Sequence, residues 1–236
     1  MAAGMTEDRG DSLSVEWADI VRFVRQLSHD LRNHLNAAEL QAVYISELAG
    51  NAELKDEIKR LRTTISGLGA TLQKLSADLG QVKPSFMPYR AIEFVEDVQK
   101  KVAHDFPEQS SAIKWDIAVQ DATLAIDPQL LQQALIELFA NAFQHSPPDA
   151  AIEAKAGIET GHFVFTLREP KAPLDLSTEN WGREPLRKIR QGHYGLGLNR
   201  VRVIVEQHNG QLHAHYDPAE SVLLTTITLP LSAQPS

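Results

Sequence analysis

Apolar residues recur at steps of three and four through the first third of the chain, which is the pattern of long amphipathic helices. Residues from about 12 to 82 contain no proline, so nothing interrupts this periodicity. One predicted helix carries a heptad seam at Leu54, Ile58, Leu61, Ile65, Leu68, Leu72, Leu75 and Leu79. The helix before it repeats every seven residues at Val24, Leu31, Ala38 and Ile45. The sequence therefore predicts a long antiparallel helical hairpin with its turn near residues 49–53.

A pair of helices this long cannot cover two apolar stripes by itself. The usual solution is a homodimer, in which two hairpins form a four-helix bundle. The alternative is a monomer whose hairpin docks on a second domain of the same chain. Asn51 is a suitable N-cap for the second helix of the hairpin.

The continuous helical periodicity ends where proline reappears in the sequence, at Pro84 and Pro88. We place a domain boundary there, which divides the chain into a disordered polar tail (1–11), the helical hairpin (12–83) and a second domain (84–236). In the second domain, helical and strand-like patterns alternate. We expect helices over 91–104, 128–146 and 196–207, and strands over 112–119, 122–127, 151–158, 162–169, 211–217 and 221–231. The predicted fold class is therefore α+β.

Composition excludes several classes of function. A net charge of −8 is unlike the basic footprint of a nucleic-acid-binding protein. Because the chain has no cysteine, it has no disulfides or thiolate chemistry, which fits a reducing cytoplasm. No apolar run reaches the roughly 18 residues that span a bilayer, so we expect no membrane segment. Apolar residues at 43% are enough for a folded core.

The stretch "LSHDLRNHLN" holds two histidines, His29 and His34. At about 100° per residue, His29 points away from the apolar stripe and His34 borders it. An exposed histidine beside Asp30 suits a nucleophile, because the carboxylate can orient the ring while the other ring nitrogen attacks. The alternative is an ordinary surface histidine.

The stretch "ELFANAFQHS" places Glu137 and Asn141 four residues apart on one face of a predicted helix. Carboxylate and amide oxygens can hold a hydrated Mg²⁺, and a carboxylate can act as a base. The alternative is a polar stripe on a surface helix.

The stretch "GHYGLGLNR" sets three glycines directly before a predicted helix: Gly192, Gly195 and Gly197. Glycines let backbone amides approach an anion, and the start of a helix favours phosphate. The alternative is a simple turn.

Taken in order, these stretches resemble the motifs of the sensor histidine kinases of two-component systems, from about residue 20 to residue 231. "SHDLRNHLN" resembles the phosphoacceptor box Ser-His-Glu-Leu-Arg-Thr-Pro-Leu. The resemblance makes His29 the phosphorylated residue and Asp30 its acidic neighbour. It places Asn33 where the family has a Thr or Asn linked to dephosphorylation of the partner.

"ELFANAFQHSP" resembles the asparagine box, which implies Asn141 as the Mg²⁺ ligand and Glu137 at a position that is Asn or Glu in related ATPases. "YGLGLNRVRVIVEQHNG" resembles the second glycine box. The ATP-binding residues implied there are Gly192, Tyr194, Gly195, Leu196, Gly197 and Leu198. The family fold is a dimeric helical hairpin followed by an α/β-sandwich ATP-binding domain of the histidine kinase and gyrase type.

Two departures from the family pattern matter. His34 replaces a proline, so the helix should lack the usual kink. In place of the first glycine box, Asp-x-Gly-x-Gly, the chain reads "REPKAP". Glu169 stands for the Asp that binds the adenine amino group, while Lys171 and Pro173 replace both glycines. A glutamate can still accept that N–H, but two added side chains crowd the backbone approach.

The resemblance implies a kinase core that phosphorylates His29 from ATP and Mg²⁺, and then an aspartate of a response regulator receiver domain. A phosphatase activity through Asn33 is compatible with the resemblance. The input comes either from another part of a larger system to which this core belongs or from a separate sensor protein. The alternative is a non-catalytic phosphotransfer or scaffold protein with a degenerate ATP-binding domain. A third alternative is a related ATPase or a serine kinase of the anti-sigma type. Proteins of those classes lack a long helical hairpin with an exposed histidine.

Overall fold

The fold is described from a computed structural model, which describes residues 17–119, 122–147, 151–171, 178, 181–183 and 196–232. The chain divides into two compact units at the bond between Leu79 and Gly80. The first unit is helical and the second combines helices with a sheet, as the sequence predicts. The expected tail, residues 1–11, lies outside the described residues.

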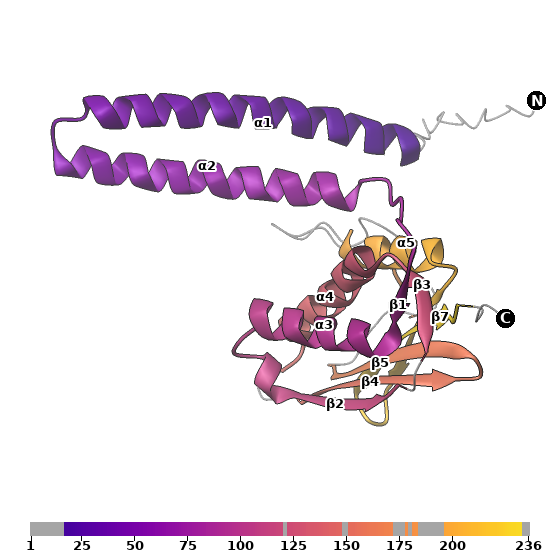
Figure 1. The fold of residues 1–236 in the computed structure, drawn as a ribbon. Helices are drawn as coiled ribbons and strands as arrows, with labels where there is room; N and C mark the ends of the chain where they lie inside the picture. The colour runs from indigo at the N-terminus through magenta and orange to yellow at the C-terminus, as the bar shows by residue number, and fades with distance from the viewer. Residues whose placement is uncertain are drawn as a thin grey trace, which may run out of the picture. The chain divides into compact units, whose positions relative to one another are not determined.

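The first unit is a hairpin of two long helices, α1 (Trp17–Leu48) and α2 (Ala52–Asp78) (Figure 1). Asn51 caps α2, because its side chain accepts a hydrogen bond from the Leu54 N–H at 2.8 Å. The predicted turn and cap are therefore confirmed. Helix α1 also runs without interruption through His34, as expected for a helix that lacks the family's proline. No helix in the described part of the chain is long and apolar enough to cross a membrane.

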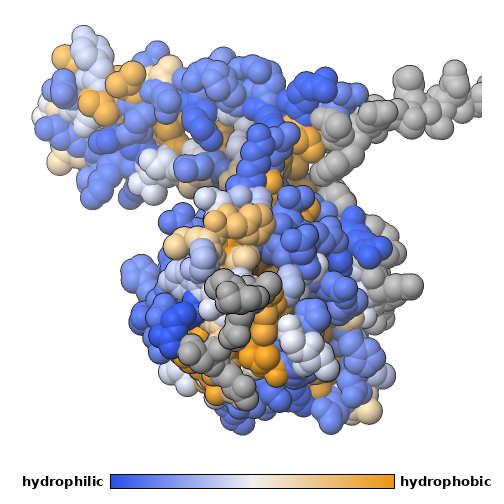
Figure 2. All heavy atoms as spheres, turned by 45° about the vertical axis from the view of Figure 1, so that its right-hand side comes forward, coloured by the Kyte–Doolittle hydropathy of each residue, from blue (hydrophilic) through white to orange (hydrophobic). Residues whose placement is uncertain are grey.

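The heptad seam is divided between a buried and an exposed face. Ile58 and Ile65 of α2 are buried, whereas Leu54, Leu61 and Leu68 are exposed by 44%, 52% and 52%. Apolar side chains are accordingly visible at the surface of the hairpin, among hydrophilic ones (Figure 2). One hairpin thus buries alternate members of the seam, because two helices meet along only one line.

In the second unit, three helices cover one face of a five-stranded sheet (Figure 1). The helices are α3 (Ala91–Asp105), α4 (Pro128–His145) and α5 (Gly197–Gln207). In spatial order the strands are β2 (Ile113–Ala118), β4 (Ile152–Glu159), β5 (His162–Pro170), β7 (Val222–Pro230) and β6 (Gln211–Asp217). Strands β2 and β4 are parallel, and the other neighbours are antiparallel. This two-layer arrangement confirms the α+β prediction.

The core lies between the three helices and the inner face of the sheet. It is rich in phenylalanine: Phe94 of α3, Phe139 of α4, and Phe163 and Phe165 of β5 are each almost fully buried. Alternate residues of β5 face this core, as the period of two in its sequence predicts. The β4–β5 hairpin turns at Thr160 and Gly161, which both have positive φ, at the predicted "ETG" turn.

Two elements were missed. The proline-containing stretch where we placed the domain boundary includes a short strand, β1 (Met87–Arg90), which pairs antiparallel with β3 (Thr123–Ile126). A two-stranded sheet has only edge strands, so Pro88 can stand in it without losing a required hydrogen bond. The prolines coincide with the change from the helical hairpin to the second domain, but β1 begins within this same proline-containing stretch. A short 3₁₀ helix (Ser110–Ala112) between α3 and β2 was likewise not predicted.

Candidate functional site

His29 lies on the solvent-exposed side of α1, and 67% of its side chain is accessible. Its Nδ1 lies 3.2 Å from Oδ1 of Asp30, and the same oxygen accepts a hydrogen bond from the Gln26 side chain at 2.9 Å. In the neutral ring, this contact favours the tautomer with the proton on Nδ1 and the lone pair on Nε2, because a carboxylate only accepts. The imidazole is thus held in the form that can act as a nucleophile at Nε2.

Two other polar residues of this stretch lie at the surface of α1. Asn33 is exposed, one helical turn after His29. His34 is also exposed, and Leu35 beside it is half-buried. His34 thus stands beside a half-buried position of α1, which is compatible with the expected place at the border of the apolar stripe.

Helix α4 brings the two residues of the asparagine-box stretch to one face. Asp127 caps the helix by accepting from the N–H groups of Gln129 and Leu130, with Pro128 at the first helical position. Glu137 and Asn141 follow on the same side and are both half-buried. Among the described residues, Nδ2 of Asn141 is buried and has no hydrogen-bond partner. Native folds rarely leave such an atom unpaired, so this amide is available to a ligand.

Helix α5 begins beside Glu137. A Cβ placed on Gly197, the first residue of α5, would overlap the Glu137 carboxylate. Leu196, just before the helix, is buried and anchors its start, and Leu198 in the first turn is half-buried. The other predicted ATP-binding residues of this stretch, Gly192, Tyr194 and Gly195, lie outside the described residues. Long-range packing of α4 on α5 thus joins Glu137, Asn141 and the helix start.

Glu169 near the end of β5 is buried, with 5% of its surface accessible. Lys171 places Nζ 3.1 Å from Oε1 of Glu169, and the Ser146 hydroxyl donates to Oε2 at 3.4 Å. Burial raises the pKa of Glu169, while the charge and hydrogen bond of Lys171 and the bond from Ser146 oppose that rise. The sequence identified Glu169, but it did not reveal that Lys171 forms an ion pair with it. A signal for this ion pair was present in the sequence: the two residues are two positions apart, which puts both side chains on one side of an extended chain.

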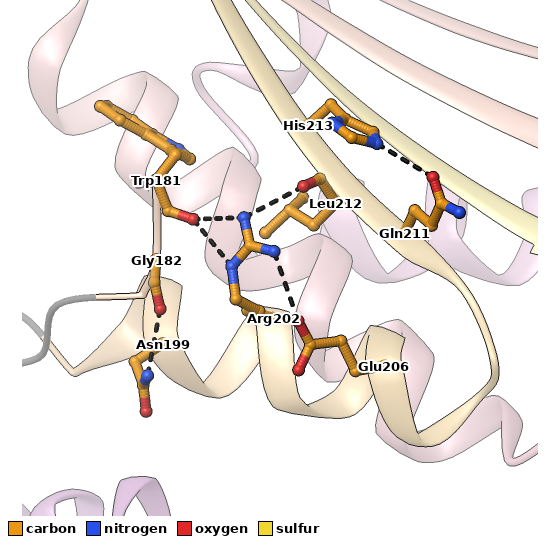
Figure 3. A network of polar contacts seen from close by, with 8 residues as sticks. All are labelled: Trp181, Gly182, Asn199, Arg202, Glu206, Gln211, Leu212 and His213. Atoms are coloured by element: carbon orange, nitrogen blue, oxygen red, sulfur yellow. Dashed lines mark hydrogen bonds and ion pairs between the residues drawn. The ribbon is translucent and has the colours of Figure 1, made fainter. Parts of the chain in front are cut away.

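A second polar cluster, around Arg202 of α5, was not predicted (Figure 3). Nε and Nη2 of Arg202 both donate to the Trp181 carbonyl, and Nη2 also donates to the Leu212 carbonyl at 3.0 Å. Asn199 donates to the Gly182 carbonyl at 3.0 Å. Gly182 has a φ of +75°, and a Cβ there would lie 2.6 Å from the Leu198 carbonyl oxygen. The cluster holds residues 181–182 against the first turns of α5.

No group of three or more His, Cys, Asp or Glu side chains in the described ranges forms a metal site. The side chains that fit Mg²⁺ are Asn141, through its amide oxygen, and Glu137, which lies four residues before it on α4. Magnesium typically uses one or two protein oxygens and keeps the rest of its shell for water and phosphate. The described residues therefore suit a nucleotide-bound Mg²⁺ rather than a cage built by protein alone.

Residues 126–233 match the family model described as histidine kinase-, DNA gyrase B- and HSP90-like ATPase. The chain is 25% identical over 228 residues to the adaptive-response sensory kinase SasA of Gloeothece citriformis, covering 84% of this chain and 55% of SasA. It is 26% identical over 236 residues to the sensor histidine kinase HprS of Escherichia coli, covering 93% of this chain and 49% of HprS. The chain thus spans about half the length of these relatives.

Solved structures share the fold. A crystal structure of full-length ShkA in complex with AMPPNP superposes with a TM-score of 0.69 at 16% identity, covering 91% of this chain and 47% of ShkA. The mycobacterial sensor histidine kinase MprB gives a TM-score of 0.51 at 22% identity, covering 64% of this chain and 100% of that chain. The matched ATPase family, the kinase relatives and the two-layer fold agree. Residues 126–233 therefore match this ATPase family, and the chain as a whole is similar to sensor histidine kinases.

Proposed function

We propose that this chain is a histidine autokinase core that transfers the γ-phosphoryl group of ATP to His29 and then to an aspartate of a response regulator receiver domain. The observation that carries the proposal is the contact between His29 and Asp30. It leaves Nε2 with a lone pair at an exposed surface, which a nucleophile requires and an ordinary structural histidine does not.

In the first step, Nε2 of His29 attacks the γ-phosphorus. A new N–P bond forms, the bond from phosphorus to the bridging β,γ oxygen breaks, and ADP leaves with that electron pair. The ring becomes a phosphorylated imidazolium, whose Nδ1 proton is hydrogen-bonded to Asp30. The Asp30 carboxylate stabilises this positive charge and can accept the proton.

The proposed binding of ATP, the phosphoryl donor, is supported by residues on α4 and at the start of α5. Asn141 and Glu137 are the residues that would hold Mg²⁺, which, when bound, offsets charge on the phosphate oxygens. The start of α5 at Gly197 favours an anion, because its first N–H groups have no partner within the helix. Gly192, Tyr194, Gly195, Leu196 and Leu198 complete the proposed phosphate loop, and Glu169 is the proposed contact for the adenine amino group.

The partner proposal rests on the face of α1 that bears His29. At about 100° and 1.5 Å per residue, Leu40 and Tyr44 lie roughly 20° and 60° around the helix from His29, and roughly 16 Å and 22 Å along it. They are 71% and 63% exposed. A receiver domain that approaches His29 along this face meets two exposed apolar side chains that can anchor it. Asn33, roughly 40° from His29, is placed to orient water against a phosphorylated receiver, which is the basis of the proposed phosphatase activity.

A homodimer is the state that covers the exposed half of the heptad seam. Leu31 and Ile45 of α1 are 42% and 48% exposed, and Leu54, Leu61 and Leu68 of α2 are similarly exposed. These positions repeat along both helices, so a second hairpin can bury all of them in a four-helix bundle. Burial of such side chains typically contributes about 1.5–3 kcal/mol each.

Autophosphorylation can be tested directly. The chain is incubated with γ-labelled ATP and Mg²⁺, and we expect acid-labile, base-stable label on the protein. His29→Gln should abolish the label. His34→Gln is the matched control, because His34 is an exposed histidine of the same helix, and it should retain the label. Label that survives His29→Gln, or no label on the unaltered chain, would contradict the proposal.

One observation favours a second candidate, a non-catalytic phosphotransfer or scaffold protein. Lys171 already engages the Glu169 carboxylate that the adenine amino group would need. In that case, His29 would accept its phosphoryl group from a phosphorylated receiver rather than from ATP. Calorimetry separates the two candidates, because tight Mg²⁺-dependent binding of ATP supports the kinase and its absence supports the scaffold.

A further inference from the structure

Glu169 and Lys171 form a desolvated ion pair on the inner side of the sheet. Their side chains are 6% and 11% exposed. The backbone of Lys171 is also held in place, because its N–H donates to the Ser221 carbonyl at 2.8 Å and its carbonyl accepts from the Tyr216 hydroxyl at 3.5 Å. The ammonium group is therefore part of a built site and not the end of a mobile surface side chain.

The pair keeps hydrogen-bonding capacity after its internal contacts are counted. A carboxylate accepts about four hydrogen bonds and an ammonium donates three. Among the residues that the structure describes, Glu169 accepts one bond from Lys171 and one from Ser146, and Lys171 commits one donor to Glu169. A carboxylate acceptor and an ammonium donor thus lie side by side, each with bonds still to offer.

We propose that Lys171 is a specificity-determining residue that donates to N1 of adenine while Glu169 accepts from the N6 amino group. This inference rests on the proposed function, in which the nucleotide base faces Glu169. Adenine presents a donor at N6 next to an acceptor at N1, which matches an acceptor next to a donor. Guanine presents the reverse, an acceptor at O6 and a donor at N1, so both contacts would be mismatched in the same pose.

The electrostatics of the pair support this role. Burial raises the pKa of Glu169, and a protonated carboxyl group would be a poorer acceptor for the N6 amino group. Lys171 opposes that rise by its charge and its hydrogen bond, which favours the ionised form of Glu169 relative to the same burial without Lys171. Hydrogen bonds that involve charged groups are the stronger ones, so each should discriminate clearly between ligands.

The test removes each side of the proposed contact in turn. Calorimetry measures binding of ATP and of 1-deaza-ATP, in which a C–H group replaces N1, to the full chain and to Lys171→Met. The unaltered chain should bind ATP at least about tenfold more tightly than 1-deaza-ATP, the ratio expected for one charged hydrogen bond. Lys171→Met should bind both equally. Lys171→Arg, which keeps a charged donor, should retain part of the preference, and GTP should bind the unaltered chain at least about a hundredfold more weakly than ATP.

Several outcomes overturn the proposal. Equal binding of ATP and 1-deaza-ATP by the unaltered chain shows that N1 is not read, although ATP binding itself would leave the proposed kinase intact. A preference that persists in Lys171→Met shows that another group reads N1. ATP binding by Lys171→Met but not by the unaltered chain makes Lys171 a block on the site. If neither protein binds a nucleotide, the proposed kinase function fails as well.

Thermal unfolding checks that Lys171→Met is folded. If it is not, Lys171→Leu, which also lacks a hydrogen-bond donor, replaces it in the same comparison. The comparison of ATP with 1-deaza-ATP on the unaltered chain needs no variant. Equal binding of the two nucleotides would by itself overturn the proposal.

Discussion

The carboxylate of Glu137 on α4 lies directly against the Cα atom of Gly197 at the start of α5. Two segments separated by about sixty residues of sequence thus meet where the resemblance to the kinases places the Mg²⁺ and phosphate contacts. A Cβ on Gly197 would overlap this carboxylate, so the Glu137 side chain would have to leave its position for any larger residue. This close contact makes Gly197 the sharpest single test of the site.

Gly197→Ala should push the Glu137 carboxylate out of the proposed Mg²⁺ site and weaken Mg²⁺-dependent ATP binding by roughly 10- to 150-fold, the factor for the loss of one charged contact worth about 1.5–3 kcal/mol. Calorimetry with ATP and Mg²⁺ measures the effect. Gly69→Ala in α2 is the matched control, because a Cβ there meets no atom within 4 Å. Unchanged ATP binding in Gly197→Ala would mean that the Glu137 contact plays no part in the nucleotide site.

Leu40→Asp should slow phosphoryl transfer from His29 to a receiver domain about tenfold or more, because it places a charge in the proposed docking face. Autophosphorylation should be unchanged. The measurement is the loss of label from the phosphorylated chain after a receiver domain is added. Leu48→Asp serves as the control, because Leu48 is 67% exposed on the same helix but lies roughly 100° around it from His29. Equal slowing by both variants would place the docking surface elsewhere.

Leu61→Glu should convert the proposed dimer to a monomer, because two charged side chains would enter its apolar centre. Sedimentation velocity of the full chain gives the mass directly. Leu40→Asp should leave the dimer intact, since Leu40 faces away from the seam. A monomeric mass for the unaltered chain would rule out the four-helix bundle and favour a hairpin that docks within its own chain.

Arg202→Met should lower the free energy of unfolding by about 2–4 kcal/mol, because it strips hydrogen bonds from the carbonyls of Trp181 and Leu212. Thermal or urea unfolding monitored by circular dichroism measures the loss. Glu206→Gln should cost less than about 0.5 kcal/mol, since the Glu206 side chain is 52% exposed and lies 3.4 Å from Arg202. Similar losses in both variants would locate the stabilisation in the ion pair and not in the carbonyl contacts.

Asp127→Asn should make the free energy of unfolding less dependent on pH in the acid range. Burial raises the pKa of Asp127, but the N–H groups of Ser85, Leu130 and Gln129 and the nearby His208 outweigh it, so the pKa lies below its ordinary value of 3.8. A carboxylate with a lowered folded-state pKa stabilises the fold above its unfolded pKa, and this contribution is lost as the pH falls through the folded value.

The difference in free energy of unfolding between the unaltered chain and Asp127→Asn should therefore be largest near neutral pH and shrink below about pH 4. Asparagine still caps a helix, so the variant isolates the charge. Chemical denaturation at a series of pH values measures the difference. A difference that stays constant with pH would mean that the charge of Asp127 does not contribute.

The sequence by itself determined the longer helices and strands and the candidate motifs, because these depend on local periodicity and on neighbouring residues. The caps at Asn51 and Asp127, the turn at Thr160–Gly161 and the limits of α5 all lie where local patterns predict them. The exposure of His29 and its contact with Asp30 also follow from adjacent positions on one helix.

Only the tertiary structure decided which distant residues meet. It set the strand order, paired β1 with β3, and placed Gly197 against Glu137 and Arg202 under the carbonyl of Trp181. It also buried the pair of Glu169 and Lys171, although their spacing of two was plain in the sequence. Burial depends on what packs around a side chain, and that is supplied by segments far along the chain. The ion-pair partner of a charged residue such as Lys171, and the extent of its desolvation, are therefore defined only in the folded domain.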